Sequence, residues 1–269
     1  MPDVEINAKD VMQLRQKTGL PMMKCKEALL ENGGDPVAAE EWLRKKLKGK
    51  METRTDRAAG EGRVAVAIEG AKAAIIELRA ETDFTAKNDK FVEAAHQVAT
   101  KALAGASIDE LNESISDLKI ETGENISVSR AEVAEGAGFG SYVHHDGKTG
   151  VLLVCDGPVE ESVGKQIGMH IVSAVPIPQG VTKDDVPESV IEKERQFALS
   201  LAEQEGKPKE IAEKMVEGKV RKLYSELALI EQDFVIDPSK KVKDVLGSVS
   251  ATKFFRFQVG EGADSGADA

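Results

Sequence analysis

The stretch "GRVAVAIEGAKAAIIELRAE", residues 62–81, decides the fold of this chain. Val64, Val66 and Ile68 alternate with alanines, and apolar residues alternate again after a turn that contains glycine. Alternation with period two on both sides of a glycine turn predicts a β-hairpin. The return strand stops at "ETDFTAKND", and apolar residues with helical spacing follow over roughly residues 88–104.

The middle of the chain repeats this plan. "FGSYVHHDGKTGVLLVCDG" (residues 139–157) predicts a strand, an Asp146-Gly147 turn and a second strand, and "VEESVGKQIGMHIVSAV" (159–175) predicts a helix. "ENISVSRAEVAE" (124–135) can add a third strand to the first sheet. The sequence therefore predicts an α+β fold in which two related α+β subdomains with small antiparallel sheets pack together.

The first fifty residues predict a separate unit of three helices. Asn7 can cap the first helix, and Asp35-Pro36 supplies a cap and a first-turn proline for the third. Each helix is near ten residues long, which is too short for stability alone in water. We expect the three helices to pack on one another around Trp42, the only tryptophan.

Two charged helical patterns, separated by "EGKPK" (205–209), predict an antiparallel helical hairpin that projects as a coiled-coil-like arm. The residues expected on its inner face are Val190, Glu194, Ala198, Leu201, Ile211, Met215, Leu223, Leu227 and Ile230. A homodimer through this arm and a monomeric projection are both compatible with the pattern. "ATKFFRFQVG" (251–260) then predicts a last strand that returns to the core.

These patterns divide the chain into a helical module, a linker, two subdomains, an arm and a tail. The segment from Lys48 to Glu61 is charged and aperiodic, and we expect it to be flexible. The predicted boundaries are 1–50 for the three-helix module, 51–61 for the linker, 62–136 for the first subdomain, 137–186 with 232–260 for the second, 187–231 for the arm, and 261–269 for a disordered tail.

Charge argues against direct nucleic-acid binding. The 36 Lys and Arg against 47 Asp and Glu give a net charge of −11, whereas a general nucleic-acid binder presents a positive field to the phosphates. A basic run between Arg44 and Arg57 is the local exception. We interpret it as cations at a helix C-terminus that continue into a solvated linker, rather than as an RNA-binding patch.

Cellular location follows from the cysteines and from hydropathy. Cys25 and Cys155 each lie in an apolar pattern, which predicts two reduced core thiols in a reducing compartment. No run of 18 apolar residues exists, and the first ten residues resemble neither a signal nor a transit peptide. We expect a cytoplasmic protein, or a mature organellar form, that has no membrane partner.

Catalytic chemistry lacks a recognisable arrangement in this sequence. His96, His144, His145 and His170 form no H-x-x-x-H spacing, and the two cysteines are isolated. The glycine-rich "GAGFG" (136–140) precedes a strand instead of the helix N-terminus that a phosphate site uses. We therefore expect no enzyme activity, no bound cofactor and no metal site.

Three stretches together resemble the translation elongation factor Ts family. They are "LRQKTGLPMMKCKEALLENGGDPVAAEEWLR" (14–44), "ETDFTAKNDKF" (81–91) and "GKPKEIAEKMVEGKVRKLY" (206–224). The resemblance implies a guanine-nucleotide exchange factor that binds elongation factor Tu in its GDP-bound and nucleotide-free states. It also implies that the N-terminal module is similar to ubiquitin-associated (UBA) domains and contacts the partner's nucleotide-binding domain, with Arg15, Met22 and Met23 at matching contact positions.

The same resemblance assigns a role to the segment between the first hairpin and its helix. In that family an Asp-Phe pair enters a cleft beside the switch region of elongation factor Tu and disturbs the Mg²⁺ and phosphate sites, so that GDP leaves. The segment carried over is Thr82, Asp83, Phe84, Thr85, Ala86, Lys87 and Asn88, in which Thr85 stands where the family commonly has valine. His144 matches a further, weaker contact position.

The residues alone leave a second account of the Asp-Phe pair. Asp83 can be a local helix cap, and Phe84 can staple onto the next helix near Phe91. The resemblance predicts the opposite, a substantially exposed Phe84. Two other functions also remain open: a UBA-like adapter with a scaffolding arm, and an RNA-associated translation protein that acts through the basic linker.

Overall fold

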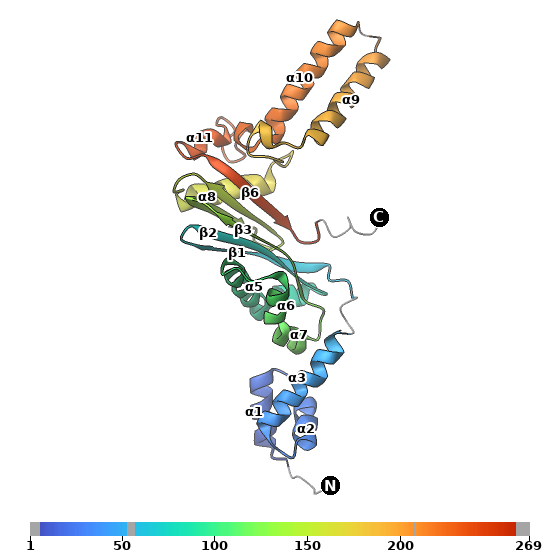
Figure 1. Cartoon of the computed structure of the whole chain (residues 1–269), viewed down its shortest axis with the longest axis vertical. Coiled ribbons are helices and arrows are strands. Elements are labelled where there is room, and N and C mark those ends of the chain that lie inside the picture. The colour runs from blue at the N-terminus through green and yellow to red at the C-terminus, as the bar shows by residue number, and fades with distance from the viewer. Residues whose placement is uncertain (1–5, 53–56, 207, 262–269) are drawn as a thin grey trace.

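The computed structural model describes residues 6–52, 57–206 and 208–261, with side chains omitted at 48–52. Figure 1 shows an elongated arrangement, with the N-terminal helices at one end, two sheets in the middle and a helical hairpin at the other end. The described chain begins in the N-terminal helices and ends beside the sheets, because its last strand belongs to the second sheet. This arrangement confirms the predicted α+β class.

Two antiparallel sheets of three strands form the centre of the molecule. The first has the order β1-β2-β3, with β1 Glu61–Glu69, β2 Lys72–Ala80 and β3 Ser127–Glu135. The second has the order β4-β5-β6, with β4 Gly138–Val143, β5 Thr149–Cys155 and β6 Ala251–Gln258. Both predicted hairpins and the predicted third and last strands are therefore confirmed.

The middle strand of the first sheet is buried on both faces. Ile76 and Leu78 point into the core under helix α5 (Asp89–Leu103), whereas Ile75 lies in a second cluster with Leu152 and Phe257 of the other sheet. Since both faces are covered, the strand is a nearly continuous apolar run. The layers follow in the order α5, first sheet, second sheet and α8 (Glu161–Ser173) (Figure 1).

Glycines permit the close approach of α8 to the second sheet. Gly164 in α8 lies against Gly140 in β4, and a Cβ at Gly164 would be 2.7 Å from the Cα of Gly140. A Cβ added at Gly168, one turn further along α8, would lie 2.5 Å from the Cβ of Tyr142. Small residues on this helix face therefore set the distance between the helix and the sheet.

A buried carboxylate joins the end of the last strand to the first sheet. Arg130 Nε donates to Glu77 Oε2 at 2.7 Å, and the backbone N–H of Gly260 donates to Glu77 Oε1 at 3.0 Å. Glu77 is almost fully buried, so these partners replace the water that its charge would otherwise bind.

The three helices of the N-terminal module form as predicted, with one correction. Its helices are α1 Ala8–Thr18, α2 Met22–Glu31 and α3 Pro36–Glu52, and Asn7 caps α1 by accepting from the N–H of Lys9. Trp42 is only partly buried, because its ring lies at the edge of the module core under the ammonium of Lys46.

The predicted flexible segment is wrong at both of its ends. Helix α3 continues through residues 48–52, since most of them have good helix propensity, and Glu61 already begins β1. Residues 53–56 of the predicted linker lie outside the described residues. The predicted tail also lies outside them, except for Glu261, whose carboxylate pairs with Arg256 at 3.0 Å.

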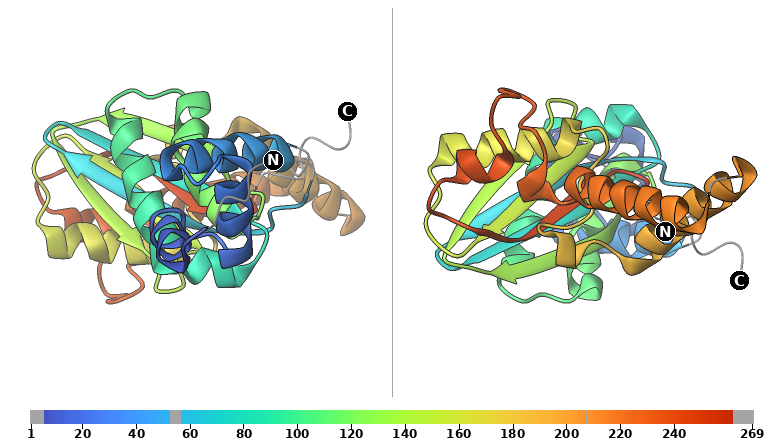
Figure 2. Two further views of the ribbon diagram at one scale, coloured as in Figure 1. Left: turned by 90° about the horizontal axis from the view of Figure 1, so that it is seen from below. Right: turned by 90° about the horizontal axis from the view of Figure 1, so that it is seen from above.

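The arm consists of α9 (Glu188–Gln204) packed along α10 (Lys209–Leu227). In both views of Figure 2 its far end projects beyond the sheets. The predicted inner face is confirmed at Ala198 and Leu227, but the other buried residues mostly lie one position further along the chain than predicted. They are Ile191, Ala202, Ala212, Val216 and Val220. Alanines on this face allow the helices to approach closely, so Val190 and Leu201 are only partly buried and Ile211 is exposed.

Short helices complete the chain around the two sheets. They are α4 Asp83–Lys87, α6 Ile108–Ser114, α7 Ser116–Thr122, α11 Val242–Leu246 and the 3₁₀ turns η1 Lys183–Asp185 and η2 Leu229–Glu231.

Both cysteines are buried and unpaired, as predicted. Burial raises the pKa of the Cys155 thiol to about 11, and the neighbouring Asp156 adds to the effect.

The glycine contact between α8 and the second sheet makes a stability prediction. We expect Gly164→Ala to destabilise the fold by roughly 1–3 kcal/mol, because the added methyl group overlaps backbone atoms. Gly218→Ala is the matched control, since its Cβ would enter open space on the exposed face of α10. That change should stabilise the protein by roughly 0.5–1 kcal/mol. Urea unfolding measures both, and equal effects would contradict the proposed overlap.

His170 predicts loss of stability in mild acid. Its Nδ1 accepts from the N–H of Val235, which leaves Nε2–H to donate to Gln232 Oε1 at 2.9 Å. Burial lowers the pKa of His170 from its ordinary value near 6.5. As the pH falls below that value, the unfolded chain takes up a proton that the folded chain disfavours, so stability falls.

Urea unfolding between pH 7.5 and 5.5 tests this. The wild type should lose stability over this range, and His170→Gln should lose less. Exposed His96 provides the control, because His96→Gln should retain the pH dependence of the wild type. An identical pH dependence in all three proteins would contradict the assignment.

Candidate partner-binding site

The segment Thr82–Asn88 forms a short helical turn between β2 and α5, which we call the Asp-Phe turn. Thr82 caps α4, because its hydroxyl accepts from the N–H of Thr85 at 3.3 Å. Asn88 ends α4 and caps α5 by accepting from the N–H of Lys90 at 2.9 Å. Ala86 is buried in the core of the first subdomain. The two caps and the buried Ala86 thus fix the turn at both of its ends.

Phe84 points away from the protein. Its side chain is 84% exposed, whereas Phe91, seven residues later, is 0% exposed in the core under the first sheet. The staple account is therefore wrong, and the predicted exposure of Phe84 is confirmed. A large apolar side chain that is this exposed on a fixed turn is typical of a residue that binds a partner.

Asp83 and Lys87 form an ion pair across the turn. Lys87 Nζ lies 2.7 Å from Asp83 Oδ2, one helical turn away. The hydrogen bond from Lys87 lowers the pKa of the Asp83 carboxyl, and the same contact raises the pKa of Lys87. Asp83 is consequently ionised at neutral pH, directly beside the exposed ring of Phe84.

Glu124, which the sequence analysis did not single out, holds the Asp-Phe turn. Its Oε2 accepts from the backbone N–H groups of Glu81 and Thr82, both at 3.1 Å. Its Oε1 accepts from the hydroxyls of Thr82 at 2.6 Å and Thr85 at 2.7 Å. The only sequence signal was "TGEN" (122–125), where Gly123 ends α7 in a left-handed conformation and is followed by an acid.

The structure brings the His144 region to the side of the Asp-Phe turn. His144 lies in the turn between β4 and β5, where its Nδ1 contacts the hydroxyl of Tyr142 at 3.0 Å. Lys148 of the same turn pairs with Glu61 at 2.6 Å, and it also contributes to lowering the pKa of Asp83. These two predicted contact regions can therefore meet one partner surface.

The other predicted contact residues lie on the three-helix module. Arg15 is exposed on α1, and Met22 and Met23 are exposed at the start of α2, with Met23 at 75%. The module rests on α7, because Ile120 packs against its core and Arg44 pairs with Asp117 at 3.3 Å. Figure 1 shows the module below α5 and α7, so that these helices lie between the module and the sheets.

The basic run on α3 is paired with carboxylates where its side chains are described. Lys45 pairs with Glu41 at 2.8 Å, and Lys46 pairs with Glu27 at 2.7 Å. Paired cations attract phosphates less strongly than free ones, in agreement with our interpretation of the run. The absence of direct nucleic-acid binding stays a prediction.

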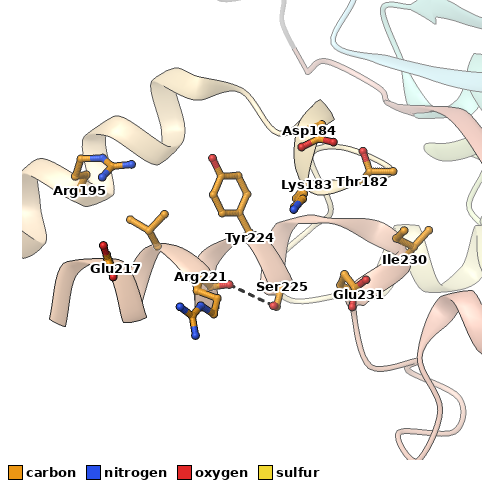
Figure 3. A pocket seen from close by; sticks show the side chains of 11 residues that line it. Thr182, Lys183, Asp184, Arg195, Glu217, Arg221, Tyr224, Ser225, Ile230 and Glu231 are labelled. Carbon is orange, nitrogen blue, oxygen red and sulfur yellow. Dashed lines mark hydrogen bonds between the residues drawn. The ribbon is translucent and has the colours of Figure 1, made fainter. Parts of the chain in front are cut away.

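A groove of about 790 Å³ lies where the arm meets the body (Figure 3). Lys183, Arg195 and Arg221 line it together with acidic residues, among them Glu217 and Glu231. Because cations and anions alternate around it, the groove favours neither charge in a ligand, and we assign it none.

Two further observations concern ligands and membranes. Within residues 6–52, 57–206 and 208–261, His, Cys, Asp and Glu side chains do not gather in threes that could hold a metal ion. None of the helices in the described part of the chain has the length and apolar composition needed to cross a membrane.

Comparisons with known proteins identify the family. The model of the family described as "Elongation factor TS" matches residues 81–261, beginning at the Asp-Phe turn. The chain is 40% identical to elongation factor Ts of Psychrobacter sp. (strain PRwf-1), over 97% of this chain and 93% of the relative. It is 38% identical to the protein of the same name from Ruegeria sp. (strain TM1040), over 96% and 94%.

The chain belongs to the elongation factor Ts family. A third relative, elongation factor Ts of Photorhabdus laumondii, is 39% identical over 96% of this chain and 94% of the relative. The chain is therefore a translation elongation factor of protein biosynthesis, as the sequence resemblance predicted.

The two phenylalanines around α4 make a stability prediction. Phe91→Ala should destabilise the fold by roughly 3–5 kcal/mol, because it empties a fully buried site. Phe84→Ala is the matched control and should change stability by less than about 0.5 kcal/mol, because the ring makes little contact in the free protein. Thermal or urea unfolding measures both. A large loss in Phe84→Ala would restore the staple account.

Proposed function

We propose that this protein is a guanine-nucleotide exchange factor for elongation factor Tu. The observation that supports the proposal is the exposed Phe84, carried beside an ionised Asp83 on a turn that is fixed at both ends. The protein binds elongation factor Tu·GDP, inserts this pair near the Mg²⁺ and phosphate site, and promotes the release of GDP so that GTP can bind.

Such a factor works by differential affinity and needs no catalytic group of its own. It binds the nucleotide-free partner more tightly than the nucleotide-bound partner, and this difference favours release. Burying Phe84 in the partner supplies roughly 1.5–3 kcal/mol. Asp83 adds a negative charge, which repels phosphate and competes for the surroundings of the cation. The proposal therefore includes no enzyme activity and no bound cofactor.

We propose that the other predicted contact residues bind elongation factor Tu as well. The UBA-like module contacts the nucleotide-binding domain of elongation factor Tu through Arg15, Met22 and Met23. His144 contacts the same partner from the β4–β5 turn, which also carries Lys148. The exchange reaction takes place in the cytoplasm, without a membrane and without direct contact to nucleic acid.

The arm has a separate, proposed role in self-association. Its buried face is used between α9 and α10, so a second copy would have to bind the residues left outside. Phe197 and Ile211 are such residues, exposed by 62% and 49%. A homodimer through residues 187–231 and a monomeric projection are both compatible with this surface.

Release of fluorescent GDP from elongation factor Tu tests the proposal. The wild-type protein should accelerate release, and Phe84→Ala should lower the acceleration roughly 10- to 100-fold, because the buried aromatic contact is lost. No acceleration by the wild type would reject the exchange function.

Phe197→Ala is the matched control, because it removes an exposed phenylalanine from the arm. It should leave the rate of GDP release within about twofold of the wild type, within the usual range of a surface substitution. If the two alanine variants lose the same activity, the specific role of Phe84 is wrong.

A further inference from the structure

The carboxylate of Glu124 accepts an unusual number of hydrogen bonds from one turn. Two come from the backbone N–H groups that lead into α4, and two come from the hydroxyls of Thr82 and Thr85. All four donors lie within residues 81–85, on both sides of Asp83-Phe84. A single side chain thus holds the backbone directly before the exposed pair and the helical turn directly after it.

From this geometry we infer that Glu124 is a positioning residue, which fixes the direction in which Phe84 and Asp83 leave the protein surface. The inference rests on the proposed exchange function. Glu124 does not touch the partner in this account. It acts by reducing the number of conformations that the Asp-Phe turn loses when it binds.

The turn needs such an anchor because its own interactions are few. Helix α4 has five residues, so most of its N–H groups have no partner within the helix. Thr82 satisfies one of them, and Glu124 satisfies the donors that precede the helix. An exposed apolar ring on an unanchored turn would sample many directions, and binding would have to select one of them.

Glu124 is itself held by a firm support. It follows Gly123, whose φ of 70° ends α7, and α7 packs against the module through Ile120. On the other side of the loop, the N–H of Asn125 donates to Glu81 Oε1 at 2.7 Å. The two loops therefore exchange backbone donors, and displacement of one displaces the other.

The threonine at position 85 fits the same account. Thr85 stands at a position where the resemblance to the elongation factor Ts family implies valine. The Thr85 hydroxyl donates to Glu124, and the side chain is half-buried. In this chain the residue after Phe84 therefore adds a contact to the carboxylate that valine cannot make.

The test combines Glu124→Ala with Phe84→Ala in the fluorescent GDP release assay with elongation factor Tu. Glu124→Ala should lower the acceleration roughly tenfold, because four contacts to the turn are lost. In the Phe84→Ala background the same change should have an effect below about twofold, because its action passes through Phe84.

Two further variants separate positioning from loss of charge or stability. Glu124→Gln should retain activity within about threefold, since the amide can accept from the backbone N–H groups and donate to the threonine hydroxyls. Glu121→Ala is the matched control, because Glu121 pairs with Lys90 and makes no contact to the turn. This variant should accelerate the release of GDP from elongation factor Tu within about twofold of the wild type.

Amide hydrogen exchange of the free protein gives an independent measurement. In Glu124→Ala the amides of Glu81 and Thr82 should lose protection, whereas that of Ile76 in β2 should keep it. Retained protection at Glu81 and Thr82 would overturn the inference, as would wild-type activity of Glu124→Ala or an undiminished effect in the Phe84→Ala background. If the wild type itself fails to accelerate GDP release, the proposed function fails, and amide exchange alone decides whether Glu124 holds the turn.

Discussion

The packing of two small sheets face to face is the constraint on which the rest of this structure depends. Neither three-stranded sheet is wide enough to form a domain alone, so each buries one face against the other and the second face under a helix. Ile75 and Leu152 meet in the middle of this contact. The one carboxylate in β2, Glu77, is tolerated because it pairs with the Arg130 guanidinium and accepts a hydrogen bond from the backbone N–H of Gly260.

The Asp-Phe turn is a consequence of that packing. Strand β2 and helix α5 both pack into the core, and the eight residues between them have little freedom. Phe91 turns inward to hold α5 against the sheet, and Phe84 turns outward because Ala86 occupies the inner side of the short helix. The exposed ring is therefore carried by a rigid base, a favourable arrangement for a residue that gains its energy only when a partner covers it.

Helix α7 connects the two predicted contact regions. It packs on the three-helix module through Ile120 and pairs with Arg44 through Asp117. Gly123 ends the helix, and the next residue, Glu124, binds the Asp-Phe turn. The module and the turn thus share one support, although about sixty residues separate Met22 from Phe84 in the sequence. A partner that contacts both would meet surfaces that are held relative to one another by the contacts of α7.

The sequence by itself determined the elements and the family, because caps, turns and hydrophobic periods act over a few residues. Both hairpins, the helices after them, the three-helix module and the matching motifs around Phe84 were predictable in this way. Only the tertiary structure decided the direction of Phe84, since a cap and staple fitted the local pattern equally well. It also placed Ile191, Ala202 and Ala212 on the buried face of the arm, next to the positions predicted, and it placed Trp42 at an edge of the module core. Glu124 could not be found from the sequence, because its partners lie 39 to 43 residues away and are joined to it only by folding.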